Sequence, residues 1–238
     1  MTLKIIIDVV LLGVLFWGIY SGRKQGVVNM TITLVALIVA LIAGQILSSM
    51  YSSTLMPAFE PFASGLADNV EEQTLADIGY GDSVVNLNDL IQQQPEMKKA
   101  YCKALYMEMG LHEGRADKIA DDAVELFDSK KITIESAAVQ TISSKMLYVL
   151  GTILASILIM ILFSALKNLI NLSFHLPNGP KFETVGGIIM GLVVAVLVCT
   201  LICWFLSFFG SFLGKDTLTS TYLGRVFLKL SPLTDWIL

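Results

Sequence analysis

The chain has 238 residues, of which 55% are hydrophobic and only 15% are charged, and its mean hydropathy is +0.71. Soluble globular domains carry about 25% charged residues, so this composition excludes that class. Intrinsic disorder is excluded as well, because it requires few apolar residues and many charges. The formal net charge is −4, and the charges are distributed very unevenly along the chain.

Long apolar blocks with few or no charges predict an all-α integral membrane four-helix bundle. A helix needs about 20 mostly apolar residues to cross the hydrocarbon core. Only a helix satisfies its own backbone N–H and C=O groups there. The predicted spans are residues 3–20, 27–47, 146–166 and 185–209. Residues 1–50 are expected to form a helical hairpin, because a six-residue loop at 21–26 joins only antiparallel neighbours, and residues 146–214 hold spans three and four.

Residues 51–145 form an acidic, helical, extramembrane insert between spans two and three. This stretch contains 16 acidic and 8 basic residues, so its formal charge is −8. Residues 134–144 are expected to run into span three as one long helix, and Gly79, Gly81 and Pro95 predict breaks. Helical spacing places several apolar side chains on one face. This face, interpreted as the exposed contact surface for a protein partner, contains Ala116, Ile119, Ala120, Ala123 and Phe127. The negative charge of the insert favours a basic partner.

The tail, residues 215–238, is predicted to be amphipathic. Its apolar residues share one face of a helix, and Arg225 and Lys229 lie off that face. Two arrangements remain open: the helix lies in the membrane interface, or it packs on the insert. The apolar face consists of Leu223, Val226, Phe227 and Leu230.

The orientation is predicted from the basic residues and from the sign of the insert. An even number of spans places both termini and the insert on the same side. The two short loops and the two termini carry four basic residues each, so the positive-inside count alone is a tie. The pair Arg23-Lys24 is hard to translocate, so we expect cytoplasmic short loops, with the termini and the insert outside. Cys102, the lone cysteine of the insert, is expected to report this with an impermeant maleimide.

Glycines recur at intervals of four residues at the ends of spans. Such rows let helix backbones approach closely, which gains van der Waals contact in lipid. We expect packing within one chain rather than a dimer interface, although a homo-oligomer remains open. The rows are Gly18, Gly22 and Gly26, then Gly187 and Gly191, then Gly210 and Gly214.

Asp8 is the one acidic residue inside a predicted span. An ionisable group within a membrane is a candidate functional site, such as part of a proton relay. The alternative is an ion pair with Lys4, one helical turn away. Asp8 also interrupts the first apolar run, and no A-x-A-like site follows it, so we expect this span to be retained rather than cleaved as a signal peptide.

Motifs that would indicate an enzyme are incomplete, and no cofactor or metal is expected. Gly79-Tyr80-Gly81-Asp82 matches the G-x-G-D pattern of intramembrane aspartic proteases, but it lies in the insert and no later span supplies a second aspartate. His112-Glu113 begins like H-E-x-x-H, but Ala116 stands where the second histidine is needed. Two distant histidines offer little for a triad or a metal site. The chain also lacks a basic patch suited to nucleic acid.

Several of these features occur in the same order in one family. The chain resembles the colicin V production protein (CvpA) family of bacterial inner-membrane proteins over residues 1–50 and 142–238. The matching features are Asp8, the turn from Gly18 to Gly26 with Arg23-Lys24, the glycine-rich segment 185–192, and Ser231-Pro232-Leu233. The family often has a basic residue just before the span-four glycines, whereas this chain has Glu183-Thr184.

The resemblance implies a multi-pass protein of the bacterial inner membrane. Its implied role is to support toxin (bacteriocin) production or secretion and cell-envelope homeostasis by binding partners, without catalysis. The family supplies no catalytic residues to carry over. The alternative function is a small channel or transporter subunit that acts as an oligomer, for which the spans offer few polar side chains.

Overall fold

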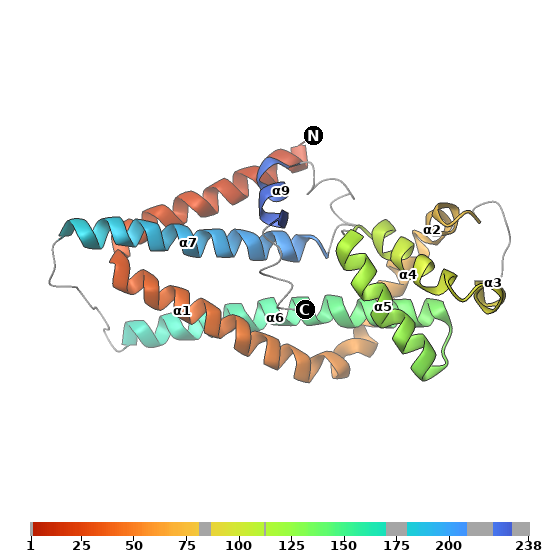
Figure 1. The fold of residues 1–238 in the computed structure, drawn as a ribbon. Coiled ribbons are helices and arrows are strands. Elements are labelled where there is room, and N and C mark those ends of the chain that lie inside the picture. The colour runs from red at the N-terminus through yellow and green to blue at the C-terminus, as the bar shows by residue number, and fades with distance from the viewer. Residues whose placement is uncertain (1, 81–86, 112, 170–179, 209–220, 230–238) are drawn as a thin grey trace. The chain divides into compact units, whose positions relative to one another are not determined.

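A computed structural model describes residues 2–80, 87–111, 113–169, 180–208 and 221–229. Over these residues the secondary structure is entirely helical, as the sequence predicts (Figure 1). The helices are α1 (Thr2–Asp68), α2 (Glu71–Asp77), α3 (Leu87–Gln93), α4 (Met97–Glu108), α5 (Glu113–Lys130), α6 (Ile134–Leu169), α7 (Pro180–Leu206) and α9 (Tyr222–Lys229). In this part of the chain, three helical segments are long and apolar enough to cross a membrane: Leu3–Ser52, Ile134–Leu166 and Phe182–Leu206.

The helix α1 contains both of the first two predicted spans. Its backbone is non-helical at Gly26, with φ 76° and ψ 171°. The chain reverses direction there, which separates a first limb (2–25) from a second limb (27–68) (Figure 1). The predicted six-residue loop at 21–26 is therefore wrong, because residues 21–25 are helical. A positive φ is readily available to glycine, which lets one residue make the turn.

Other predicted helix boundaries agree with the structure. The helix α6 is continuous from Ile134 to Leu169, which confirms that residues 134–144 lead directly into the third apolar segment. Gly79 follows α2 with φ 90°, and Pro95 lies between α3 and α4, so these two breaks are confirmed. Gly81 lies outside the described residues.

The chain divides into two compact units, and each is described by itself. The apolar unit comprises Met1–Met50, Leu150–Phe205 and Leu218–Leu238. The acidic unit comprises Tyr51–Val149 and Leu206–Thr217. The division falls inside α1, α6 and α7, so these elements contribute to both units.

The apolar unit exposes large hydrophobic side chains along its helices. Phe16 of α1 and Leu158 of α6 are 68% and 67% exposed. A cluster of buried residues lies between the second limb of α1 and α7, and it contains Met30, Leu37, Leu41 and Val194. Exposed apolar surface on this scale indicates surroundings other than water.

The acidic unit has the opposite organisation, with apolar residues inside and, apart from Arg115, its charges outside. Its helices α4 and α5 pack against each other. Ala116, Ile119, Ala120 and Ala123 of α5 are almost completely buried in this unit. The helical periodicity of this face is therefore correct, but the interpretation as an exposed partner surface is wrong. The fifth residue, Phe127, is half-buried, and the Lys98 ammonium lies 4.6 Å from its ring centroid.

Candidate functional site

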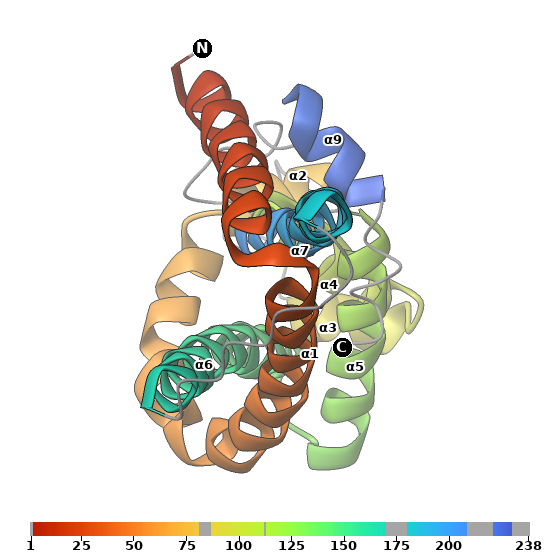
Figure 2. The same cartoon turned by 90° about the vertical axis from the view of Figure 1, so that its left-hand side faces the viewer.

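Two of the three predicted glycine rows meet where the first limb of α1 lies beside α7 (Figures 1 and 2), and the third, Gly210 and Gly214, lies outside the described residues. Gly18 and Gly22 face Gly187 and Gly191. A Cβ atom added at Gly18 would lie 2.6 Å from the carbonyl oxygen of Gly191, and one added at Gly22 would lie within 3.0 Å of that of Gly187. Real Cβ atoms essentially never approach so closely, so this crossing excludes every side chain larger than hydrogen at these positions. The contact lies within one chain.

The third glycine of the first row, Gly26, lies against the side chain of Glu183. A Cβ atom added at Gly26 would lie 2.9 Å from Cγ and from Oε1 of Glu183. Glu183 stands in the first turn of α7, where negative charge is favourable for the helix dipole. The acidic side chain just before the span-four glycines therefore covers the turn between the two limbs of α1.

A second crossing of small residues joins the second limb of α1 to α6, and the glycine search missed it. Ser156 Oγ shares its proton between the carbonyl oxygen of Thr152 in its own helix, at 2.6 Å, and that of Ala40, at 3.1 Å. Cβ atoms added at Gly44 and Gly151 would lie 2.5 Å from Ser156 Oγ and Ser48 Oγ, respectively. The signal in the sequence is Ala40, Gly44 and Ser48 at four-residue spacing, which a search for small residues rather than glycine alone would have found.

Asp8 makes a contact that the sequence did not suggest. Its Oδ1 accepts a hydrogen bond from the backbone N–H of Leu223 over 3.0 Å, and its Oδ2 accepts one from Tyr222 over 3.3 Å. These are the first two residues of α9, so the carboxylate of Asp8 caps this helix from α1. The predicted pair with Lys4 is not among the ion pairs of the described residues.

The tail is described only over α9 and the residue before it. Phe227 is buried, whereas Val226, on the same predicted face, is 54% exposed. Part of the apolar face therefore packs inside the apolar unit and part remains exposed. Leu230 and the residues after it lie outside the described part of the chain.

Hydroxyl groups in the apolar helices mostly bond to their own helix. Thr31, Thr33 and Thr200 each donate to a carbonyl oxygen four residues earlier, at 2.8–2.9 Å. In the described part of these helices, the buried atoms without a hydrogen-bond partner include Asn29 Oδ1, Gln45 Nε2 and Thr152 Oγ1.

One face of the acidic unit carries paired charges. Lysines of α4 approach acidic residues of α5, and Lys145 of α6 approaches Asp122 at 2.8 Å. The α4–α5 pairs are Lys98–Asp128 at 2.7 Å, Lys99–Asp117 at 3.2 Å, Lys99–Asp121 at 2.8 Å, Lys103–Glu113 at 2.9 Å and Lys103–Asp117 at 3.8 Å. Hydrogen bonds to Asp121 and Asp117 raise the pKa of Lys99 and keep its ammonium charged.

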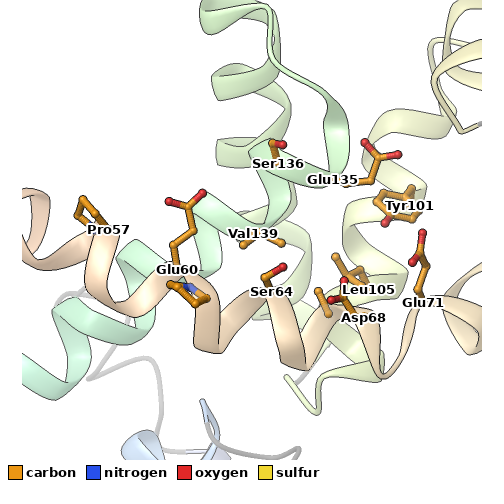
Figure 3. Close-up of a pocket in the computed structure, with 12 residues that line it drawn as sticks. Pro57, Glu60, Ser64, Asp68, Glu71, Tyr101, Leu105, Glu135, Ser136 and Val139 are labelled. Carbon is orange, nitrogen blue, oxygen red and sulfur yellow. The ribbon is translucent and has the colours of Figure 1, made fainter.

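A cavity of about 440 Å³ in the acidic unit carries unpaired acidic residues (Figure 3). Its carboxylates come from Glu60 and Asp68 of α1, Glu71 of α2 and Glu135 of α6. Among the described residues, none of the four forms an ion pair or a hydrogen bond with a side chain. Asp68 and Glu71 are exposed, so the cavity opens to solvent. The sequence analysis missed this site because its carboxylates are up to 75 positions apart.

Tyr101 of α4 points into this cavity between Glu71 and Glu135 (Figure 3). It is only 2% exposed, and its hydroxyl has no hydrogen-bond partner among the described residues. Burial, followed by the charges of Glu71 and Glu135, raises the pKa of Tyr101 well above its ordinary value. The hydroxyl therefore stays protonated at neutral pH, and its oxygen is available to accept a hydrogen bond.

Arg115 is a buried cation that the sequence analysis did not single out. Its Nη1 donates a hydrogen bond to Ser207 Oγ, and its guanidinium lies 5.3 Å from the ring centroid of Phe208. Both partners follow the C-terminal end of α7 and belong to the acidic unit. A buried charge needs such partners to offset its desolvation, so Arg115 joins this short segment to α5.

Cys102 is unsuitable as a reporter of orientation. The residue is completely buried. Burial, with a smaller contribution from Glu135, raises the pKa of its thiol from 9.0 to about 12. Since the thiolate is the reactive form, a maleimide added to the folded protein will not label Cys102 from either side of the membrane.

The described residues contain no group of three or more His, Cys, Asp or Glu side chains that could hold a metal ion. His112 and His175 lie outside these residues, as does Asp82 of the G-x-G-D motif. Comparisons of this chain with protein-family models, with curated proteins and with solved structures found no match.

Proposed function

We propose that this chain is a non-enzymatic integral membrane protein similar to the CvpA family. In this proposal it supports toxin production or secretion and cell-envelope homeostasis by binding a protein partner with a basic surface. The supporting observation is that residues carrying the resemblance, far apart in sequence, lie in contact: Gly18 and Gly22 with Gly187 and Gly191. Short sequence matches that meet at one helix crossing support the resemblance more strongly than short matches that lie apart in the structure.

The proposed membrane arrangement has four crossings. The segment Leu3–Ser52 has 50 residues, so a straight helix of that length would extend about 75 Å, far more than the hydrocarbon thickness of about 30 Å. The reversal at Gly26 divides it into two limbs of suitable length. With α6 and α7 they form the proposed four-helix bundle.

The proposed location is the bacterial cytoplasmic membrane, with the short loops inside and the termini and acidic insert outside. Cysteines introduced by Gln73→Cys and Lys24→Cys would test this, because both side chains are exposed and lie in the insert and at the Gly26 turn, respectively. In intact cells an impermeant maleimide should label the first variant and not the second. The reverse pattern would contradict the orientation and leave the four crossings intact.

The function itself is tested in a strain that lacks the gene. Deletion should reduce the toxin released into the medium and increase sensitivity to envelope stress, and the wild-type gene should restore both. Full-length protein purified in an uncharged detergent should retain a basic partner at low salt and release it at high salt, as expected for electrostatic steering. Unchanged toxin release and stress sensitivity in the deletion strain would reject this proposal.

A small channel or transporter subunit is the second candidate. The observation in its favour is the set of buried polar atoms without partners, Asn29 Oδ1, Gln45 Nε2 and Thr152 Oγ1, which water or a solute would satisfy. Against it, the threonine hydroxyls described above already bond to their own helices. Ion or solute flux through liposomes that contain purified protein, above that of empty liposomes, would favour this candidate over partner binding.

A further inference from the structure

We propose that the cavity lined by Glu60, Asp68, Glu71, Glu135 and Tyr101 binds an organic cation, an ammonium or guanidinium group. The inference deepens the proposed function and rests on it, because lysine and arginine side chains of a basic partner present these groups. A free amine presents the same chemistry, and the experiment below separates the two sources.

The first argument is the distribution of charge within the acidic unit. Every acidic residue on α5 except Glu125 has a lysine from α4 or α6 within 4.0 Å, whereas the four cavity carboxylates have none among the described residues. The paired lysines, Lys98, Lys99, Lys103 and Lys145, thus neutralise carboxylates of α5 and none of the cavity. Unpaired like charges around a hollow raise its negative potential and attract a cation.

The second argument is the hydroxyl of Tyr101. Its neighbour on α4, Tyr106, is equally buried but donates a hydrogen bond to the carbonyl oxygen of Ala138 over 2.9 Å. Tyr101 has no such partner and points into the cavity (Figure 3). The open cavity leaves this hydroxyl to water, and an ammonium or guanidinium N–H can replace that water as its hydrogen-bond partner by donating to the phenolic oxygen. The tyrosine ring also offers a face on which a cation binds favourably.

The dimensions and the donor set indicate the class of cation. A volume of about 440 Å³ lies within the usual range for small-molecule sites, and it accommodates a lysine or arginine side chain. The described residues contain no cluster of ligands suited to a metal ion. A multivalent organic cation can instead reach carboxylates that lie apart, and the charge repels anions.

The experiment uses the full-length protein in an uncharged detergent and two probes. One is agmatine, a free amine with an ammonium and a guanidinium group, and the other is a short lysine-rich peptide. Titration calorimetry should detect binding that weakens as salt is added. Glu71→Gln and Glu135→Gln should each weaken binding by about tenfold, because each removes a charge-assisted hydrogen bond. Tyr101→Phe should weaken it by a few-fold.

Two variants serve as matched controls. Glu125→Gln also removes one negative charge from the insert, but at an exposed position outside the cavity, and it should change affinity by less than about twofold. Tyr106→Phe removes a buried hydroxyl from the same helix and should leave affinity unchanged in protein that remains folded. Hydrogen exchange of α4 and α6 in each variant identifies any effect of misfolding.

Each outcome of these titrations either supports the cation site or contradicts it. Tighter binding of the peptide would identify a partner side chain as the ligand, and tighter binding of agmatine would identify a free amine; both support the site. Failure of the wild-type protein to bind either probe would overturn the inference, as would a Glu125→Gln variant that is as defective as Glu71→Gln. Cavity binding in a protein whose deletion leaves toxin release unchanged would reject the proposed function alone.

Discussion

The two units of this chain pack their helices in different ways, because their surroundings differ. In the apolar unit, large side chains such as Phe16 and Leu158 face outward, and the closest helix contacts are made by glycine. In the acidic unit, large side chains such as Tyr106 and Ile142 are buried, and charges lie outside. Without a hydrophobic driving force between helices in lipid, close backbone contact replaces side-chain burial as the main source of stability. The difference predicts opposite sensitivities to substitution.

The largest effect is expected from filling the glycine crossing. Gly22→Leu should destabilise the apolar unit by about 1–3 kcal/mol or more, because the new side chain meets the backbone of α7, which cannot move aside as a flexible side chain can. Thermal unfolding in detergent measures this. The matched control is Gly13→Leu on the same limb, where an added Cβ has nothing within 4 Å and stability should be retained. Equal losses in both variants would contradict a specific role of the crossing, because leucine is the better helix former at either position.

The second-largest loss of stability is expected when a large buried side chain of the acidic unit is replaced by a smaller one. Ile119→Ala should destabilise this unit by about 2–5 kcal/mol, since Ile119 is buried and its neighbours relax only partly around the space left behind. Hydrogen exchange of α4 and α5 in the full-length protein reports the loss. Glu125→Ala, an exposed change one turn and a half further along α5, should stay within about 0.5 kcal/mol. An unprotected α5 in the wild-type protein would argue that this face is available to partners after all.

A smaller effect is expected at Asp8. Asp8→Ala removes the acceptors for the first two N–H groups of α9 and should cost about 1 kcal/mol. Asp8→Asn keeps an acceptor and should retain most of the stability. Exchange rates of the Tyr222 and Leu223 amides measure the capping directly. If Asp8→Asn proves as harmful as Asp8→Ala to function but not to exchange, the charge itself is needed, as in a proton relay.

The smallest effect at neutral pH is expected from the thiol of Cys102. Folding raises its pKa from 9.0 to about 12. Above pH 9 the unfolded state therefore binds fewer protons than the folded state, and stability should fall as pH rises toward 12. The raised pKa values of Tyr101 and Tyr106 act in the same direction. Cys102→Ala should flatten the pH dependence only in part, and full labelling of the folded wild-type protein at pH 7 would contradict the burial.

The sequence predicted what depends on local patterns and missed what depends on tertiary contacts. Apolar block length gave the helices, and four-residue spacing gave Gly18, Gly22, Gly187 and Gly191 as contact positions. Periodicity also found the apolar face of α5, but it cannot distinguish a face that a neighbouring helix covers from one that awaits a partner.

The acidic cavity illustrates the same limit. The sequence gives no reason to single out Glu60, Glu71 or Glu135, because a charge in an acidic insert is normally solvated. Tyr101 does not stand out in the sequence either. What sets the cavity carboxylates apart is that the lysines of α4 lie against α5 and leave them without partners, which only the fold decides. The capping of α9 by Asp8 joins residues more than 200 positions apart, so the sequence could not predict it either.

The one-residue turn at Gly26 has a consequence for how this chain tolerates changes in length. Ordinary hairpin loops absorb insertions, because their residues are not in phase with the helices on either side. Here the helix runs uninterrupted into the turn, and Gly187 also lies against Gly26. One residue inserted between Gly22 and Gly26 would rotate the preceding glycines by about 100° relative to the turn and direct them away from α7. A turn of one residue therefore leaves little freedom for a change in register.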